Sequence, residues 1–136
     1  MSYDKITVVI NTFNSEDKIH QCLNSISSEI KIIIVENSNN TNFKIELEKK
    51  YKNLKCILTG QNLGYAKGNN LGLSLVKTKF ALIINPDAEV QSHTIENFFI
   101  AAKAKPNFAI IAPYIQEAKN SISPKEKKLG IYEVKN

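Results

Sequence analysis

The sequence contains no long hydrophobic run. A transmembrane helix needs about 20 consecutive apolar residues, and no segment of the chain approaches that length. The first residues, 1–5, lead into no apolar core of a signal peptide. We therefore expect a cytoplasmic protein. Membrane association, if it occurs, is expected to be peripheral, at the inner face, or through a segment outside this sequence.

Cysteine and histidine are scarce, with two residues of each. Cys22 and Cys56 match no metal or redox spacing, so we interpret them as small core residues in a reducing compartment. His20 and His93 fall on a helix and near a helix start, and neither has a partner nearby in the sequence. Because no Ser/His/Asp or Cys/His arrangement is recognisable, the sequence identifies no catalytic nucleophile or general base.

The positive charge is modest and lies partly at one end. The net charge is +5, and the segment from Lys119 onward holds five Lys and two Glu. Aromatic residues do not alternate with these lysines, so a solvated tail is favoured over a nucleic-acid surface. We expect no nucleic-acid partner, while attraction to an anionic membrane surface stays open.

Five apolar segments alternate with amphipathic segments of helical period, which predicts an α/β protein with a Rossmann-like, mostly parallel sheet and flanking helices. Asn14 or Ser15 is expected to cap the first helix and Ser92 the fourth. Residues 1–116 form the predicted α/β domain, and 117–136 form a charged C-terminal tail, loop or disordered, with Gly130–Val134 as a last short strand. The predicted strands are Lys5–Asn11, Ile30–Glu36, Leu54–Leu58, Phe80–Ile84 and Phe108–Ala112.

Polar residues follow the first four strands, where ligands of parallel α/β sheets bind. We call these four segments the rim: Asn11–Asn14, Glu36–Ser38, Thr59–Asn62 and Asn85–Glu89. Within Asn85-Pro86-Asp87, a carboxylate at a strand end can bind Mg²⁺ or Mn²⁺, and Glu89 can reach the same place. An ordinary Asx or proline turn is the alternative.

Four of the five glycines lie in residues 60–72. This glycine segment opens a predicted helix, whose free N–H groups favour an anion, and Lys67 adds a positive charge. A tight turn with close helix–sheet packing is the alternative. Glu36 can accept hydrogen bonds from a nucleobase or ribose, or be a solvated strand end. Phe13 can stack on a base or cover the core.

Together these segments resemble family 2 glycosyltransferases of the GT-A fold, especially the rhamnosyltransferase-like branch. The matching segments, in the family's order, are Val8–Ser15, Ile33–Ser38, Asn62–Asn70 and Ile84–Asp87, and the resemblance covers Ile6 to Pro113. It implies transfer of a sugar from a nucleotide-diphosphate donor, UDP- or dTDP-linked, to a glycan or lipid-linked acceptor hydroxyl. The transfer is expected to invert the anomeric centre and to serve polysaccharide assembly.

The resemblance also implies roles for individual residues. Asp87 would hold the Mg²⁺ or Mn²⁺ ion. Residues 1–116 would be the nucleotide-sugar-binding domain, and Glu36 stands where the family usually has Asp. The predicted nucleotide-binding residues are Thr12, Phe13, Asn14, Glu36, Asn37, Asn62, Lys67 and Asn85.

The chain differs from the family in its length. Family members commonly continue for another hundred residues or more, which supply the acceptor site and the general base. We therefore expect the C-terminal part to be short or absent here. A non-catalytic or truncated module that binds a nucleotide sugar is the first alternative, with self-association into a homo-oligomer through uncovered apolar surface. A sugar nucleotidyltransferase is the weaker alternative.

Overall fold

The computed structural model describes residues 2–113 and 130–133. The chain divides into two compact units, residues 2–91 and the described residues from Ser92 onward. Each unit is presented by itself below. All the residues predicted to bind nucleotide or metal lie in residues 2–91.

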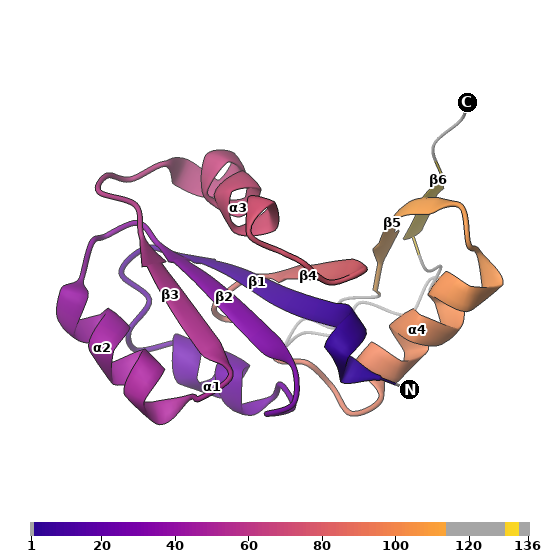
Figure 1. Ribbon diagram of the computed structural model, residues 1–136, viewed down its shortest axis with the longest axis horizontal. Helices are drawn as coiled ribbons and strands as arrows, with labels where there is room; N and C mark the ends of the chain where they lie inside the picture. Colours follow the sequence, from indigo (N-terminus) through magenta and orange to yellow (C-terminus); the bar gives the residue numbers. More distant parts are fainter. Residues whose placement is uncertain (1, 114–129, 134–136) are drawn as a thin grey trace, which may run out of the picture. The chain divides into compact units, whose positions relative to one another are not determined.

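The centre of residues 2–91 is a four-stranded parallel sheet in the order β3-β2-β1-β4 (Figure 1). The strands are β1 (Ile6–Thr12), β2 (Lys31–Glu36), β3 (Leu54–Leu58) and β4 (Phe80–Ile84). Val8, Val9, Ile10, Ile34 and Val35 have no exposed surface, as expected of parallel strands covered on both faces. The predicted parallel α/β sheet is confirmed, with the boundaries of β1 displaced by one residue.

Two helices cover one face of the sheet and a third covers the other (Figure 1). Helices α1 (Ile19–Asn24) and α2 (Thr41–Lys50) lie on the first face, and α3 (Gly64–Ser74) lies on the second. A short 3-10 turn, η1 (Tyr3–Lys5), precedes β1. Cys22 on α1 and Cys56 on β3 are buried free cysteines, which confirms that both are core residues.

Helix α3 contacts the sheet through glycines. A Cβ atom at Gly68 would overlap the side chain of Asn11, and one at Gly72 would overlap Val9 and lie 3.1 Å from Val35 Cγ2. The four-residue glycine spacing therefore lets the helix backbone approach β1 and β2 closely. At these two positions the packing interpretation of the glycine segment is confirmed.

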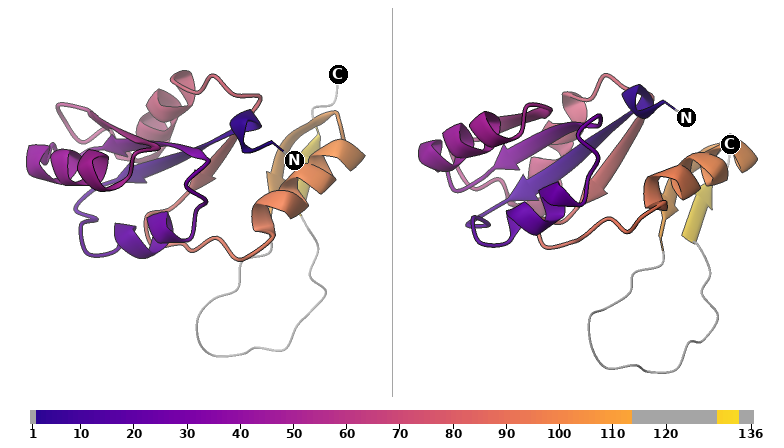
Figure 2. Two further views of the ribbon diagram at one scale, coloured as in Figure 1. Left: turned by 60° about the horizontal axis from the view of Figure 1, so that its bottom comes forward. Right: turned by 90° about the horizontal axis from the view of Figure 1, so that it is seen from below.

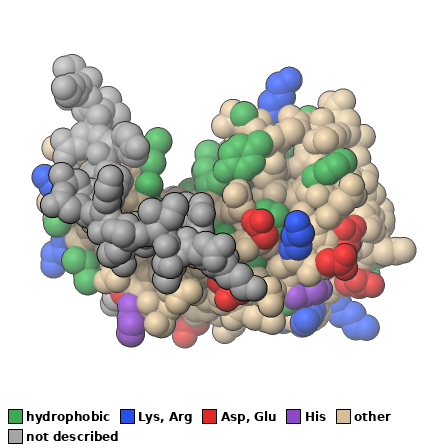
Figure 3. Space-filling model, turned by 180° about the vertical axis from the view of Figure 1, so that it is seen from behind, with side chains coloured by type: hydrophobic (Ala, Val, Ile, Leu, Met, Phe, Trp, Pro, Cys, Tyr) green, Lys and Arg blue, Asp and Glu red, His purple; other side chains and the backbone are tan. Residues whose placement is uncertain are grey.

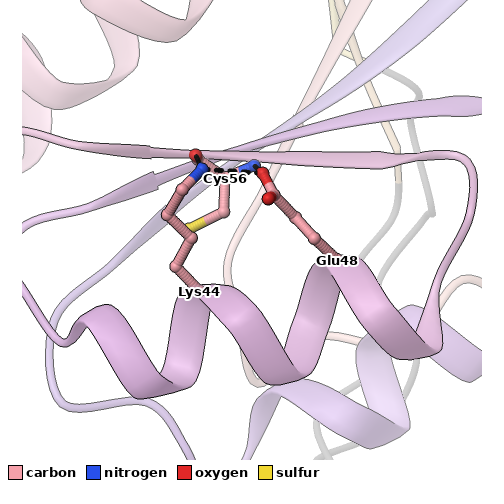
Figure 4. A network of polar contacts seen from close by, with 3 residues as sticks. All are labelled: Lys44, Glu48 and Cys56. Carbon is pink, nitrogen blue, oxygen red and sulfur yellow. Dashed lines mark hydrogen bonds and ion pairs between the residues drawn. The ribbon is translucent and has the colours of Figure 1, made fainter.

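The free edge of β3 is covered by a pair of charged residues from α2 (Figure 4). Glu48 Oε1 accepts a hydrogen bond from the backbone N–H of Cys56 at 2.9 Å, while Lys44 Nζ donates to the Cys56 carbonyl. Lys44 and Glu48 also form an ion pair of 2.8 Å, which lowers the pKa of the Glu48 carboxyl. These side chains satisfy backbone groups that an edge strand leaves unpaired.

The second unit contains α4 (Thr94–Ala104) and the antiparallel pair β5 (Phe108–Ala112) and β6 (Gly130–Glu133) (Figure 2). The fifth predicted strand thus forms where expected but pairs with β6 and not with the parallel sheet. A strand also begins at Gly130, as predicted. Residues 114–129 and 134–136, which hold most of the predicted tail, lie outside the described residues.

Both predicted N-caps of helices are wrong. Helix α1 begins only at Ile19 and has no side-chain cap, and Ser15 Oγ accepts instead from the Phe13 N–H at 3.2 Å. Helix α4 is preceded by His93, whose φ of 64° is left-handed and whose side chain makes no capping bond. In both places loop geometry decides where the helix begins.

The described surface carries charges of both signs. Lysine and acidic side chains are interspersed on the face shown in Figure 3. Large apolar side chains also reach the surface just after α3 and on β4, with Leu75 and Ile83 each 40% exposed. Among the described residues, no helix combines the length and the hydropathy that a membrane span requires.

Candidate functional site

The rim forms one continuous polar edge of the sheet. Because β1, β2, β3 and β4 are parallel, their carboxyl ends point in the same direction, and Thr12 lies directly opposite Glu36 in the strand register. Thr59 Oγ1 donates to the Glu36 carbonyl at 3.3 Å, which joins the end of β3 to that of β2. The structure therefore brings together the polar strand ends, as the sequence predicts.

Glu36 is fully buried at the carboxyl end of β2. Its Oε2 accepts a hydrogen bond from Thr12 Oγ1 at 2.8 Å. Its Oε1 accepts hydrogen bonds from the Ser38 backbone N–H at 2.6 Å and from the Ser38 hydroxyl. Thr12 is itself only 1% exposed. Both residues were predicted to contact a nucleotide, but here they bond to other parts of the rim.

Asn37 belongs to a second buried network, beneath the start of α3. Its Nδ2 donates to Asn11 Oδ1 and, at 3.1 Å, to the Thr12 carbonyl. Its Oδ1 accepts from the Leu63 backbone N–H at 3.0 Å, and Asn11 Nδ2 donates to the Gly64 carbonyl at 3.2 Å. These amides attach the glycine segment to the ends of β1 and β2.

Phe13 and Asn14 are the exposed rim residues after β1. The Phe13 ring is 53% exposed, which leaves it free to stack on a planar ligand and does not support the core-covering alternative. Asn14 has a left-handed φ of 49°, a conformation that Asn tolerates better than most residues. Its backbone N–H donates to Ser38 Oγ at 3.3 Å, so the loop after β1 is held against the loop after β2.

The glycine segment places Asn62 and Lys67 on the surface. Gly60 and Gly64 have positive φ angles of 79° and 74°, which explains why glycine suits these two turn positions. Asn62 Oδ1 accepts from the Gly64 backbone N–H at 2.9 Å. Lys67 is exposed in the first turn of α3, where a cationic side chain and the helix dipole both favour an anion.

Asn85, Asp87 and Glu89 form the exposed end of β4. The Ala88 N–H donates to the Asn85 carbonyl at 3.1 Å, which closes the predicted turn. Burial, with the nearby charges of Asp87 and Glu89, raises the pKa of the Cys22 thiol to about 12. Within residues 2–113 and 130–133, no hydrogen bond or ion pair engages the Asp87 carboxylate.

These residues fit a divalent cation that also binds phosphate. The described residues contain no group of three His, Cys, Asp or Glu side chains able to hold a metal by themselves. A single exposed carboxylate is nevertheless sufficient for Mg²⁺, which usually keeps several water and phosphate ligands. Asp87 is suited to this role because its oxygens are accessible.

The sequence did not single out two amides, the half-buried Asn11 and the buried Asn69. Asn11 was part of the rim but was not predicted to have a role, although it joins Asn37 to α3. Asn69 is 4% exposed, and its Oδ1 is a buried acceptor without a partner among the described residues. Asn69 lies between Gly68 and Gly72 in the glycine segment, which signals close packing. The sequence around Asn11 carries no such signal.

The parallel sheet with its polar rim is the fold of a GT-A glycosyltransferase. The sequence pattern of the family described as Glycosyl transferase family 2 matches residues 7–135. The chain therefore belongs to this glycosyltransferase family. No curated protein matches the chain.

Solved structures share the fold at low sequence identity. S. aureus TarS 1-349 in complex with UDP-GlcNAc is 21% identical with a TM-score of 0.71, covering 90% of this chain and 37% of its own. The mannosyltransferase PcManGT from Pyrobaculum calidifontis, in complex with GDP-Man and Mn2+, is 14% identical with a TM-score of 0.69. It covers 83% of this chain and 36% of its own. The chain thus spans little more than a third of either neighbour.

These findings decide some predictions and leave others open. Membership of family 2 and the GT-A fold are confirmed. The family match does not distinguish a rhamnosyltransferase-like branch, which stays a prediction. It favours sugar transfer over the nucleotidyltransferase alternative.

Proposed function

We propose that residues 2–91 form the donor-binding part of a glycosyltransferase that uses a nucleotide-diphosphate sugar and Mg²⁺ or Mn²⁺. The observation that carries this proposal is the continuous rim with exposed Asp87, in the same sheet unit as exposed Lys67 of α3. The solved neighbours support it, since their structures contain UDP-GlcNAc or GDP-Man with Mn2+.

The exposed residues of the rim and Lys67 of α3 take the direct roles in this proposal. Asp87 holds the metal ion, and Lys67 with the start of α3 attracts the diphosphate. Phe13 stacks on the base, while Asn14, Asn62 and Asn85 present amides to the nucleotide. A bound metal would neutralise negative charge on the departing nucleoside diphosphate.

The reaction proposed for the whole protein is transfer to an acceptor hydroxyl with inversion, in polysaccharide assembly. A glycan or lipid-linked molecule is the proposed acceptor, and the inner face of the membrane is the proposed site of action. The general base belongs to the acceptor side of such a site, within hydrogen-bonding reach of the hydroxyl. No residue of this chain is assigned to that role.

Binding without transfer is the second candidate function. A module of this kind would hold the donor and self-associate through apolar surface such as Leu75 and Ile83, which are each 40% exposed. Release of free sugar or sugar transfer by the purified chain would exclude this candidate.

Calorimetric titration with UDP, dTDP and GDP, each with and without Mn²⁺, tests the donor site. We expect at least one nucleotide to bind more tightly with the metal, and Asp87→Ala to lose that metal dependence. Glu46→Ala is the matched control, because Glu46 is an exposed carboxylate on α2. The proposed function fails if the parent chain binds none of the three, or if Asp87→Ala keeps the full metal dependence.

A further inference from the structure

Glu36 is an unusual residue for a position without exposure. An ionised carboxylate loses much hydration free energy on burial and normally requires a cation or several donors in compensation. Here no exposed surface remains, and within the part of the chain that the structure describes the hydrogen bonds to its carboxylate oxygens come from neutral groups of Thr12 and Ser38. Nothing in the core packing of β2 requires an acid, so the cost points to a function at the rim.

The donors to the Glu36 carboxylate come from the end of β1 and from the loop after β2. Thr12 ends β1, and Ser38 lies two residues beyond Glu36 in the loop after β2. Each carboxylate oxygen accepts hydrogen bonds from one of these residues. Oε2 accepts from the Thr12 hydroxyl, and Oε1 accepts from the N–H and the hydroxyl of Ser38. The carboxylate is therefore a bridge between the end of β1 and the loop after β2.

The bridge extends to an exposed residue. Because the Ser38 hydroxyl donates to Glu36, its lone pairs remain free to accept from another group. The Asn14 N–H donates to this oxygen at 3.3 Å, and Asn14 holds the left-handed φ of 49°. Glu36 thus supports the strained conformation of a predicted nucleotide contact through Ser38.

We propose that Glu36 is a positioning residue of the donor site: its buried carboxylate orients Thr12, Ser38 and, through Ser38, Asn14, and does not itself contact the base. This inference rests on the proposed function, because it assigns the support of the same nucleotide-binding rim. It differs from the sequence expectation, in which Glu36 bonds directly to a base or ribose.

The two roles predict different responses to Glu36→Gln. The variant keeps the shape of the side chain but replaces one carboxylate oxygen by an NH₂ group. That group then faces either the Thr12 hydroxyl or the donors of Ser38. A positioning role predicts that affinity falls for UDP, dTDP and GDP by a similar factor, about tenfold, the scale of a hydrogen bond to a charged group. A direct base contact predicts that the factor differs strongly among bases, because their edges present different donors and acceptors.

Thr12→Val is the matched variant of the donor. It removes the Thr12 hydroxyl that donates to Glu36 Oε2 and keeps nearly the same side-chain volume. If Glu36 acts through Thr12, the two losses of affinity should not add in the double variant. Full additivity would overturn the bridge. Titrations are made well below the unfolding midpoint of every variant, so that loss of folded protein does not enter the comparison.

Nuclear magnetic resonance of the ¹⁵N-labelled chain gives a readout that does not depend on ligand. We expect Glu36→Gln to shift the amide signals of both Ser38 and Asn14, and to speed hydrogen exchange at Asn14. An unchanged Asn14 signal, or unchanged affinity for all nucleotides, would overturn the positioning role.

The experiment separates the failure of this inference from the failure of the proposed function. If the parent chain binds none of the three nucleotides, the donor-site proposal fails, and the positioning of a donor site by Glu36 fails with it even where the Asn14 signal shifts. If the parent binds and Glu36→Gln loses only one nucleotide, the function stands and Glu36 is a direct ligand.

Discussion

The rim has two regions that share one edge of the sheet but differ in burial. At the ends of β1 and β2, Thr12, Glu36 and Asn37 are each at most 2% exposed and bond to one another's loops. At the end of β4, Asp87 and Glu89 are exposed. Both regions are polar, and the sequence alone makes them look equivalent.

This difference separates residues that maintain the rim from residues that can meet a ligand. Buried polar groups are costly unless each is hydrogen-bonded, so those at β1 and β2 should affect stability when changed. Exposed carboxylates at β4 can be changed with little effect on folding. The following predictions use the free energy of unfolding to test that contrast, from the largest effect to the smallest.

Gly72→Ala should have the largest effect, because it disturbs the packing of α3 on β1 and β2, the two strands whose ends form the buried region. The new Cβ would overlap Val9 and lie 3.1 Å from Val35 Cγ2. Overpacking of this kind costs up to about 3 kcal/mol, offset by about 1 kcal/mol from the better helix propensity of alanine. We expect a net loss of about 2 kcal/mol in urea unfolding. Asn70→Ala, at an exposed position of the same helix, is the control. A stability gain in Gly72→Ala would contradict the close packing of α3.

Cys22, whose thiol donates to the Asn85 carbonyl at 3.6 Å, should make stability fall at alkaline pH. Its pKa is raised from 9.0 to about 12, first by burial and then by Asp87 and Glu89. The native state keeps a proton that the unfolded state releases above pH 9, so this stabilisation is complete below pH 9 and is lost as pH rises through 12. The loss should reach about 1.4 kcal/mol between about pH 8 and about pH 10.

Urea unfolding of the parent and of Cys22→Ala at both pH values measures this effect. The variant should lose less stability on going to the higher pH, whatever its absolute stability. Cys56, whose pKa is also raised to about 12 by burial, serves as the comparison thiol in Cys56→Ala. Equal pH dependence in parent and Cys22→Ala would show that the thiol is ionisable in the native state.

Asp87→Ala should have the smallest effect on folding. The side chain is exposed, and surface substitutions of this kind usually change stability by less than about 0.5 kcal/mol. The same variant is expected to lose metal-dependent nucleotide binding. Its nucleotide affinity should therefore change while its free energy of unfolding stays nearly the same. If its unfolding midpoint falls as far as that of Gly72→Ala, the contrast between the two regions is wrong.

Local patterns predicted most of the elements. The apolar segments at residues 54–58, 80–84 and 108–112 form strands with the predicted limits. Helix starts were less predictable, since Ser15 and Ser92 offer capping hydroxyls but the chain enters both helices through other loop geometry. The pairing of Phe108–Ala112 depends on a partner far along the chain, so no local pattern could assign it to a second sheet.

The sequence by itself determined the alternation of strands and helices and therefore the polar rim, because period and composition act over neighbouring residues. Tertiary structure alone decided which rim residues are buried. Glu36 and Asp87 are both acids after apolar strands, but β2 has a neighbouring strand on each side and β4 is an edge strand in the described sheet. Donors from both sides enclose Glu36, whereas Asp87 remains open to solvent and to a ligand.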